Sequence, residues 1–324
     1  MQRILVSEVS YQKARSTFES INDSQSDFVF QPAAEDEASL SALVASEGIR
    51  GFIADLEPYQ GPLYTALGNG GVISRYGVGH DSIDKDAARA AGVTVCNTPG
   101  VLDNAVAEHA VWMLGALARP LAQGNESTHA GNWKPAQGIE IRGRKVTVLG
   151  CGRIGRALCR KLGIGLEMEL TGYDIMQSPD FGENSGIAHY TTDLDEAISD
   201  ADFVICLLPV LEATKHIANA EFFSKMKPGA RFINSARGAL VDENALFDAL
   251  NSGHLSAAAL DVFEAEPYQP QSAEKDLRSL PQLIMTPHIG SNTEESNAGM
   301  ASTAAQNIMT VLTKGADACP NVVS

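Results

Sequence analysis

The chain has 324 residues, enough for two domains with separate cores, and its 44% of hydrophobic and 20% of charged residues are those of an ordinary globular protein. Its formal net charge of −16 disfavours nucleic acids and anionic membrane surfaces as partners. The five cysteines lack the spacing of metal ligands, so no metal site is predicted. The sequence also has no 18-residue apolar segment, and its N-terminus resembles a strand and not a signal peptide, which together predict a cytoplasmic protein.

The first hundred residues alternate strand-like and helical segments. Strands are predicted at 3–6, 51–54, 71–76 and 93–96, with helices such as Ala38–Glu47 and Asp84–Ala91 between them. This alternation predicts a small α/β domain. The next segment, Val101–Ala118, is apolar on most of its faces, so we expect a helix buried at a domain or subunit boundary.

A second series of strand-like runs begins at Lys145. The six runs lie at 145–149, 168–173, 202–208, 230–234, 256–261 and 283–286. They complete a doubly wound parallel sheet, so residues 100–286 are expected to form one domain. Only one long helical stretch, about 292–314, remains after it and is expected to pack on the N-terminal domain. The smaller domain would then comprise 1–99 plus 287–324, with the larger one inserted into it.

A glycine-rich turn follows the first of these strands. The segment VLGCGRIGRAL places Gly150, Gly152 and Gly155 between a β-branched strand and a helix that begins near Arg153. The spacing alone is a weak signal, but Asp174 ends the next strand, 19 residues after Gly155, where an acid binds the ribose of a dinucleotide. With the helix N-terminus facing the pyrophosphate, the pattern predicts a Rossmann dinucleotide site.

Two details of this turn bear on the cofactor and on reactivity. Asp174 would repel a 2′-phosphate, and the following Ile175, Met176 and Gln177 include no cation to hold one, so NAD is predicted over NADP. Cys151 has two interpretations: a small side chain that points away from the cofactor, or a thiol at a helix N-terminus that alkylation would block unless NAD is bound.

Three further groups follow successive strands of the predicted sheet. Arg237 lies just past the strand at 230–234, Asp261 ends the next strand with Glu266 five residues later, and His288 follows the last strand. Each alone has an ordinary structural explanation. Ligands of open α/β sheets bind at the carboxyl ends of the strands, where all these groups would meet beside the glycine turn. A cation, an acid and an imidazole together predict a catalytic site.

Six segments of the chain match the motifs of one enzyme family in order and spacing. They are SRYGVGHDSID (74–84), NTPGVLDNAVAEHAVWML (97–114), GCGRIG (150–155), INSARGALVDENAL (233–246), ALDVFEAEP (259–267) and TPHIGSNTEES (286–296). On these segments the chain resembles the D-2-hydroxyacid dehydrogenase family, phosphoglycerate dehydrogenases and glyoxylate/hydroxypyruvate reductases included, nearly end to end. The resemblance implies an α/β fold in which the Rossmann domain is inserted into a smaller flavodoxin-like substrate domain.

The resemblance also implies roles for individual residues. His288 would be the general acid/base, Glu266 its carboxylate partner, and Arg237 the cation that holds the substrate's carboxylate and carbonyl. The substrate carboxylate would also meet the backbone N–H groups of Gly77, Val78 and Gly79. Implied cofactor contacts are Gly150, Gly152, Arg153, Ile154, Gly155, Asp174, Leu208, Pro209, Thr214, Ala236, Asp261 and Gly290.

The chemistry of 2-keto acid reduction agrees with these assignments. The reaction needs a hydride, a proton for the developing alkoxide, and positive charge for the carboxylate and the oxyanion. NADH, His288 and Arg237 would supply them in turn. The carboxylate of Glu266 disfavours formate dehydrogenases, which resemble this fold but pair the histidine with glutamine. A rival pair, Glu108–His109, is set aside because adjacent helix residues do not face each other.

The substrate itself is narrowed by departures from the family pattern. His80 stands where the family often has an aromatic residue, and the loop ADLEPYQGP (54–62) carries Asp55 and Glu57, which would repel a phosphate. Arg75 keeps phosphoglycerate as an alternative, but a small acid such as glyoxylate or hydroxypyruvate is favoured. A distant alternative is a protein similar to the NADH-sensing corepressors. The family and the apolar Val101–Ala118 segment also suggest a homodimer.

Overall fold

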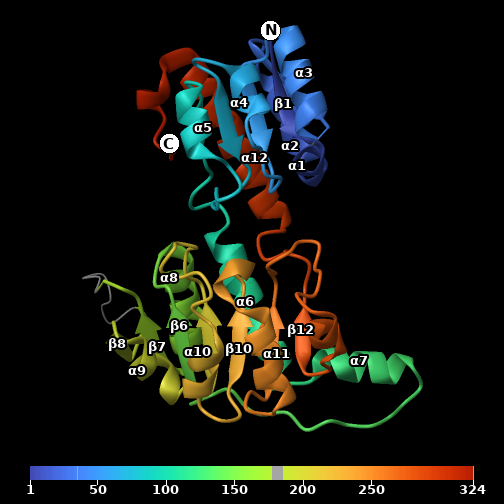
Figure 1. Cartoon of the computed structure of the whole chain (residues 1–324), viewed down its shortest axis with the longest axis vertical. Coiled ribbons are helices and arrows are strands. Elements are labelled where there is room, and N and C mark those ends of the chain that lie inside the picture. Colours follow the sequence, from blue (N-terminus) through green and yellow to red (C-terminus); the bar gives the residue numbers. More distant parts are fainter. Residues whose placement is uncertain (35, 177–184, 324) are drawn as a thin grey trace. The chain divides into compact units, whose positions relative to one another are not determined.

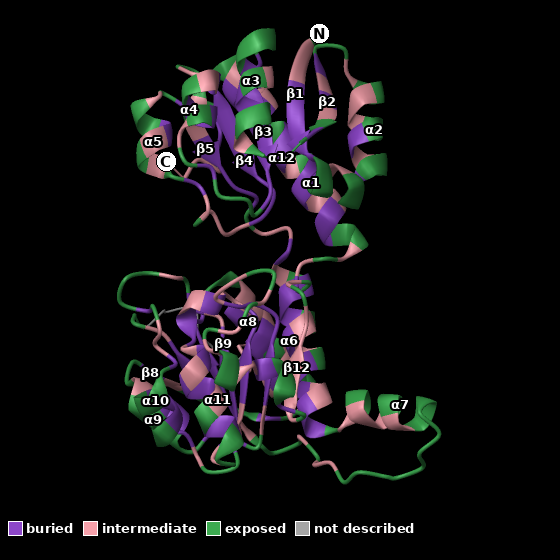
Figure 2. Cartoon of the chain, turned by 45° about the vertical axis from the view of Figure 1, so that its right-hand side comes forward, coloured by how far each residue is buried: buried purple, intermediate pink, exposed green. Residues whose placement is uncertain are grey.

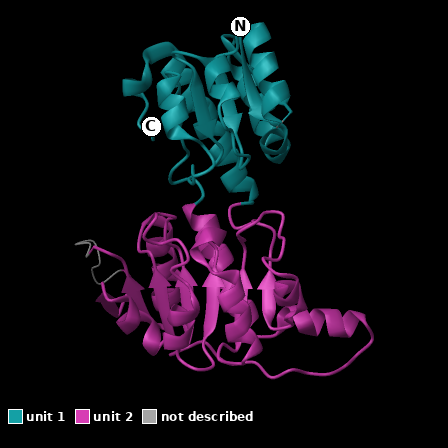
Figure 3. Cartoon of the chain, in the orientation of Figure 1, with its two compact units in different colours: residues 1–102, 292–324 teal, residues 103–291 magenta. Residues whose placement is uncertain are grey.

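The computed structural model describes residues 1–34, 36–176 and 185–323, and these form two compact units (Figure 3). Unit 1 comprises residues 1–102 and 292–324, and unit 2 comprises residues 103–291. The chain leaves unit 1 after Leu102 and returns to it at Asn292, so unit 1 is discontinuous in sequence. Within the described ranges, no helix combines the length and apolar composition needed to cross a membrane.

Unit 1 contains, in its described residues, a five-stranded parallel sheet of order β2-β1-β3-β4-β5, which is the flavodoxin-like order. The strands are β1 (Gln2–Ser7), β2 (Phe28–Ala33), β3 (Gly51–Ala54), β4 (Val72–Arg75) and β5 (Thr94–Cys96). Strand β2 was absent from the predicted elements. Its sequence FVFQPA contains Pro32, which cannot donate to a neighbouring strand and is therefore tolerated at the edge position that β2 occupies.

The helices of unit 1 cover both faces of this sheet (Figures 1 and 2). They are α1 (Glu8–Lys13), α2 (Arg15–Ser24), α3 (Glu37–Glu47), α4 (Pro62–Leu67), α5 (Lys85–Ala90), α12 (Glu294–Lys314) and the short η5 (Ala316–Ala318). Helix α12 packs against β3 and β4, as expected for the stretch at 292–314. Buried Asn307 ties it to the sheet region by donating to Ser74 Oγ (3.1 Å) and to the Asn97 carbonyl (2.8 Å).

Unit 2 contains, in its described residues, a seven-stranded parallel sheet of order β12-β11-β10-β9-β6-β7-β8. The strands are β6 (Lys145–Leu149), β7 (Glu169–Tyr173), β8 (His189–Thr191), β9 (Phe203–Cys206), β10 (Arg231–Asn234), β11 (Ala257–Leu260) and β12 (Leu283–Met285). This is the doubly wound Rossmann order with one added strand, and the winding reverses between β6 and β9. The predicted six strands are all present. The seventh, β8, was missed because it is a three-residue edge strand without an apolar run.

Alternate residues of the unit 2 strands enter two separate cores. Val148 and Ile205 pack on one face with α6 and α8, whereas Val204 and Phe232 pack on the other. The sheet is therefore buried on both faces, as its near-continuous apolar strands require.

The longer helices of unit 2 lie along these two faces except for α7, which has no buried residue and extends away from the sheet (Figure 1). The helices of this unit are α6 (Asp103–Ala118), α7 (Leu121–His129), α8 (Arg153–Cys159), the π-helix η1 (Arg160–Gly165), α9 (Leu194–Ser199), α10 (Ala220–Lys225), α11 (Glu243–Asn251) and the 3₁₀ turns η2 (Gly238–Leu240), η3 (Ala273–Lys275) and η4 (Leu277–Ser279). Helix α6 packs on α8, β10 and β11. The helix predicted from Arg153 changes to π-helix at Arg160, in a segment whose glycines, Gly163 and Gly165, disfavour a continued α-helix.

Candidate active site

The glycine turn lies at the carboxyl end of β6, beside the point where the winding of the sheet reverses. Gly150 has φ +95°, and a Cβ on Gly155 would lie 2.0 Å from the Gly150 carbonyl oxygen, so neither position accepts another residue. Gly152, the N-cap of α8, differs: among the described residues no atom lies within 4 Å of its Cβ position. The backbone there is open to a ligand at a helix N-terminus, which fits the pyrophosphate of a dinucleotide.

Asp174 is held against this turn by its own carboxylate. One oxygen accepts the Cys151 N–H (2.9 Å) and the other accepts the Ile175 N–H (2.8 Å). Ile175 and Met176 are strongly exposed apolar side chains, 70% and 73%, at the same strand end. Gln177, the third residue of the predicted cation-free stretch, lies outside the described residues. An acid beside two exposed apolar side chains matches the ribose and adenine parts of a nucleotide.

Cys151 itself turns inward. Its side chain is 5% exposed, and a Cβ on Gly172 of β7 would lie 3.0 Å from its sulfur. This packing supports the interpretation in which the thiol points away from the cofactor, and it removes the basis for alkylation at the pyrophosphate position.

The segment after β9 forms a turn closed by Thr214. Its hydroxyl accepts the Leu211 N–H (2.8 Å) and donates to the Pro209 carbonyl (2.7 Å). Leu208 is buried below the turn, whereas Pro209 and Leu211 remain exposed on it. The predicted contacts Leu208, Pro209 and Thr214 thus belong to one ordered segment at the same sheet edge as Asp174.

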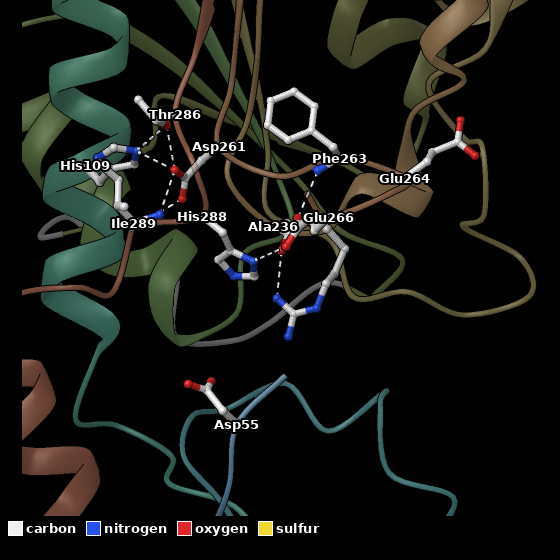
Figure 4. Close-up of polar contacts among 12 residues, drawn as sticks. Asp55, His109, Ala236, Asp261, Phe263, Glu264, Glu266, Thr286, His288 and Ile289 are labelled. Atoms are coloured by element: carbon white, nitrogen blue, oxygen red, sulfur yellow. Dashed lines mark hydrogen bonds and ion pairs between the residues drawn. The ribbon is translucent and has the colours of Figure 1, made fainter. Parts of the chain in front are cut away.

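His288 and Glu266 form the pair that the sequence analysis predicts (Figure 4). His288 Nδ1 lies 2.7 Å from Glu266 Oε2, and the other carboxylate oxygen accepts the Phe263 N–H at 3.0 Å. The side chains are 23% and 31% exposed, so the pair is reachable yet partly shielded from water. An imidazole held by a carboxylate in this way is oriented to act as a general acid/base.

Arg237 is positioned by the strand end that carries it. Asn234 donates to the Arg237 carbonyl (2.8 Å) and accepts the Ala236 N–H (3.1 Å), and the Arg237 guanidinium donates to the Ala236 carbonyl (2.8 Å). A Cβ on Gly238 would lie 1.9 Å from the backbone carbon of Phe263. The Arg237 segment therefore touches the backbone of the loop that carries Glu266, and the two cannot be separated without loss of packing.

Two acids that the sequence analysis did not single out fix this loop. The Glu264 N–H donates to Glu243 Oε1 (2.8 Å), and the Glu243 N–H donates to Glu264 Oε1 (3.4 Å). Glu243 is 3% exposed, and burial raises its pKa. His216 Nε2 lies 3.0 Å from the second oxygen of Glu264. This reciprocal clamp joins the first turn of α11 to the loop at 261–267.

Asp261 is the centre of a second group of contacts, at the turn that carries His288 (Figure 4). It is 1% exposed, and it accepts the Thr286 hydroxyl (2.6 Å) and the N–H groups of Ile289 (2.9 Å) and Gly290 (2.8 Å). Its own carbonyl accepts the His288 N–H (2.8 Å). His288 has φ +53°, a conformation that these four contacts of Asp261 maintain.

His109 joins the same group from helix α6. Its Nε2 lies 3.3 Å from Asp261 Oδ1, whereas the neighbouring Glu108 is directed to Asn104 and Lys161. Glu108 and His109 do not pair, as the sequence analysis argued. His109 nevertheless has an acidic partner, Asp261, which is distant in sequence and therefore gives no local spacing signal.

Gly77, Val78 and Gly79 form a turn in unit 1, after strand β4. The Gly77 carbonyl accepts the Thr98 N–H (3.0 Å), and the Val78 carbonyl accepts an Asn97 amide proton (2.8 Å). No hydrogen bond within the ranges that the structure describes uses the N–H groups of these three residues. A turn whose carbonyls are occupied and whose N–H groups are open suits an anion such as a carboxylate.

Comparisons with known proteins place the chain in a family. Residues 111–290 match the model described as "D-isomer specific 2-hydroxyacid dehydrogenase, NAD binding domain". The chain is 36% identical to the glyoxylate reductase of Thermococcus litoralis over 262 residues, covering 78% of this chain and 76% of the relative. It is 38% identical to the chloroplastic D-3-phosphoglycerate dehydrogenase 2 of Arabidopsis thaliana over 239 residues, 73% of this chain and 37% of the relative.

A solved structure extends the likeness to the whole chain. The NADPH-dependent glyoxylate/hydroxypyruvate reductase of Sinorhizobium meliloti, in complex with NADP and malonate, superposes with a TM-score of 0.84 at 27% identity, covering 100% of this chain and 97% of that one. The folds of both units thus have counterparts in this solved structure. The chain belongs to the D-isomer specific 2-hydroxyacid dehydrogenase family and is an oxidoreductase that acts on the CH–OH group of 2-hydroxy acids.

Proposed function

We propose that the protein is an NAD-dependent D-2-hydroxyacid dehydrogenase that reduces a small unphosphorylated 2-keto acid, glyoxylate or hydroxypyruvate. The observation that carries the proposal is the His288–Glu266 pair at 2.7 Å. Its members follow β12 and β11, and Arg237 follows β10, the next strand of the same sheet. Support for the substrate comes from the glyoxylate reductase and the glyoxylate/hydroxypyruvate reductase to which the chain is similar.

The proposed roles follow from the charges that the reaction develops. Bound NADH supplies the hydride. Protonated His288 gives its proton to the carbonyl oxygen as negative charge grows on it, and Glu266 stabilises the imidazolium before transfer. Arg237 holds the substrate carboxylate and the developing oxyanion, and the open N–H groups of Gly77–Gly79 receive the carboxylate.

The proposed cofactor site uses unit 2 alone. The residues assigned to it are Gly150, Gly152, Arg153, Ile154, Gly155, Asp174, Leu208, Pro209, Thr214, Ala236, Asp261 and Gly290. In this proposal, unit 2 is the nucleotide-binding domain and unit 1 the substrate domain. We assign cofactor binding to unit 2 because the backbone at Gly152 is open. We assign substrate binding to unit 1 because the turn at Gly77 suits an anion.

Phosphoglycerate is the second candidate substrate, because one relative is a phosphoglycerate dehydrogenase and Arg75 lies next to the carboxylate turn. The charge around Arg75 favours the smaller acids. Its guanidinium is buried and lies 4.0 Å from Asp55, which also accepts bonds from Ser10 (3.1 Å) and Lys13 (3.2 Å). A phosphate at this position would meet the Asp55 carboxylate, whose negative charge offsets part of the positive charge of Lys13 and Arg75.

A panel of substrates tests the proposal directly. NADH oxidation is followed with glyoxylate, hydroxypyruvate, pyruvate and phosphohydroxypyruvate, and kcat/KM is compared between them. We expect the highest values for glyoxylate or hydroxypyruvate. A preference for phosphohydroxypyruvate would transfer the assignment to phosphoglycerate dehydrogenase, and no turnover of any 2-keto acid would refute the proposed function.

Asp174 is predicted to select NAD over NADP. Asp174→Ala removes the acceptor for the ribose hydroxyls, so the Kd for NADH should rise by roughly tenfold or more. Asp174→Asn keeps an acceptor and removes the charge, so it should mainly improve NADPH binding. Titration of cofactor fluorescence measures both affinities, with Asp248→Ala, an exposed acid paired to Lys275, as the control. A wild-type enzyme that uses NADPH as well as NADH would contradict this assignment.

We also propose a homodimer formed through the α6–α7 region of unit 2. Trp112 on α6 is 71% exposed, Leu121 on α7 is 65% exposed, and Trp133 beyond it is 88% exposed. A second copy of the chain would cover these apolar side chains. Sedimentation velocity should report a dimer for the wild type and a monomer for Trp112→Arg combined with Leu121→Arg. A monomeric wild type at micromolar concentration would overturn the dimer without affecting the catalytic assignment.

A further inference from the structure

His109 and Asp261 form a nearly enclosed histidine–carboxylate couple behind the turn that carries His288. Their side chains are 16% and 2% exposed. His109 Nε2 lies 3.3 Å from Asp261 Oδ1 and 3.4 Å from Thr286 Oγ1, and the Thr286 hydroxyl donates its proton to the same Asp261 oxygen at 2.6 Å. Because the hydroxyl proton is already used, Nε2 must carry the proton that His109 shares with both oxygens.

Asp261 connects the imidazole of His109 to the turn that carries His288. Its carboxylate accepts the backbone N–H groups of Ile289 and Gly290, and a Cβ on Gly290 would lie 3.5 Å from the His109 ring. Asp261 is one of the cofactor contacts of the proposed function, and the family resemblance implies that it would hold the nicotinamide carboxamide. One carboxylate therefore touches the His109 proton, the backbone of the catalytic turn and, by that proposal, the edge of the cofactor ring.

Other charges on the elements packed against α6 are engaged elsewhere. The remaining acids of the helix, Asp103 and Glu108, pair with Arg153 of α8 and Lys161 of η1. From β10, Arg231 donates to the Leu117 carbonyl, two turns further along the helix. The charged group in contact with His109 from β11 is Asp261, and Thr286, beyond β12, is neutral.

The two members of the couple differ in what pH does to them. Burial of Asp261 alone would raise its pKa, but the bonds from His109, Thr286 and the Ile289 N–H outweigh it and hold the pKa below its usual range. Asp261 therefore stays ionised across the working range of pH, and any change in the charge of the couple comes from His109. The couple carries one negative charge when His109 is neutral and none when it is protonated.

We propose that His109 is a positioning residue that sets the charge at the nicotinamide edge, and thereby makes the relative affinity for NAD⁺ and NADH depend on pH. The oxidised ring is positive and the reduced ring is neutral. A negative couple therefore favours NAD⁺ at high pH, and a neutral couple favours NADH at low pH. This preference for NADH at low pH matches the proposed reaction, since keto-acid reduction consumes NADH and a proton together. The inference rests on the proposed cofactor site.

Equilibrium binding separates this effect from catalysis. The Kd for NADH is measured by its fluorescence and that for NAD⁺ by competition, in full-length protein carrying His288→Gln so that the catalytic pair does not titrate. As pH rises from about 5.5 to 8, the ratio Kd(NAD⁺)/Kd(NADH) should fall about fivefold. With His109→Gln added, which keeps an N–H donor and removes the charge, the ratio should change by less than about twofold.

Two further variants complete the test. His109→Asn replaces the glutamine variant if that one fails to fold, because it also offers an uncharged N–H donor. His189→Gln is the matched control, since His189 lies 3.0 Å from Glu196 in an exposed pair between β8 and α9, and it should leave the ratio unchanged. An equal pH dependence with and without His109 would overturn the inference while leaving the cofactor site intact. Failure of the wild type to bind any nicotinamide cofactor would instead refute the proposed function, and this inference with it.

Discussion

His288→Gln is expected to lower kcat/KM for keto-acid reduction by about 10²- to 10⁴-fold, with the Kd for NADH little changed. The variant removes the proton donor and leaves the glycine turn and Asp174 in place. Stopped-flow or steady-state kinetics give the rate, and fluorescence titration gives the affinity. A variant that retains near wild-type turnover would exclude His288 as the acid/base.

Glu266→Gln completes this prediction by changing the pH dependence. The carboxylate 2.7 Å from His288 Nδ1 favours the imidazolium, so an amide in its place makes the imidazole lose its proton at lower pH. Keto-acid reduction needs the protonated form, and its decline with rising pH should begin at a lower pH. Hydroxy-acid oxidation needs the neutral form and should persist to lower pH than in the wild type.

Paired pH profiles of kcat/KM, one for each direction, measure the two limbs. Both must move to lower pH, because one proton governs both directions. Glu196→Gln, which alters the exposed pair with His189, is the control and should leave the profiles in place. Limbs that shift in opposite senses, or do not shift, would show that Glu266 is not the partner of His288.

The second large effect is expected at Arg237. Arg237→Lys keeps the charge, but lysine cannot offer the planar two-pronged contact that fits a carboxylate. We expect kcat/KM to fall by roughly 10²-fold, with thermal unfolding and NADH affinity close to wild type. Arg278→Lys, at an exposed pair with Asp276, is the matched control. A lysine variant as active as the wild type would remove Arg237 from substrate binding.

The central strands of both sheets were predictable because each is a short apolar run buried on two faces. The edge strands β5 and β12 were predicted as well, but β2 and β8 were not, because β2 contains Pro32, which only an edge position tolerates, and β8 is a three-residue strand without an apolar run. The change from α8 to the π-helix η1 has no periodic signal either, because the apolar spacing of 3.6 residues continues across Arg160.

The candidate site shows a similar limit. The strand-end rule indicated His288, Glu266 and Arg237, and the first two are in contact in the structure. The supporting residues have partners far away in sequence: His109 contacts Asp261, and Glu243 clamps Glu264. Such pairs carry no local spacing, so only the folded chain reveals them.

The discontinuity of unit 1 has a consequence for biosynthesis. Residues 103–291 form an uninterrupted unit, so its sheet can assemble during translation as soon as β12 has left the ribosome. The first 102 residues emerge earlier but lack α12, whose Asn307 bonds Ser74 and Asn97 across the sheet of unit 1. The N-terminal strands therefore leave the ribosome without the helix that covers them, and unit 1 is complete only after α12 has been synthesised. Translation of unit 1 therefore begins before that of unit 2 and ends after it.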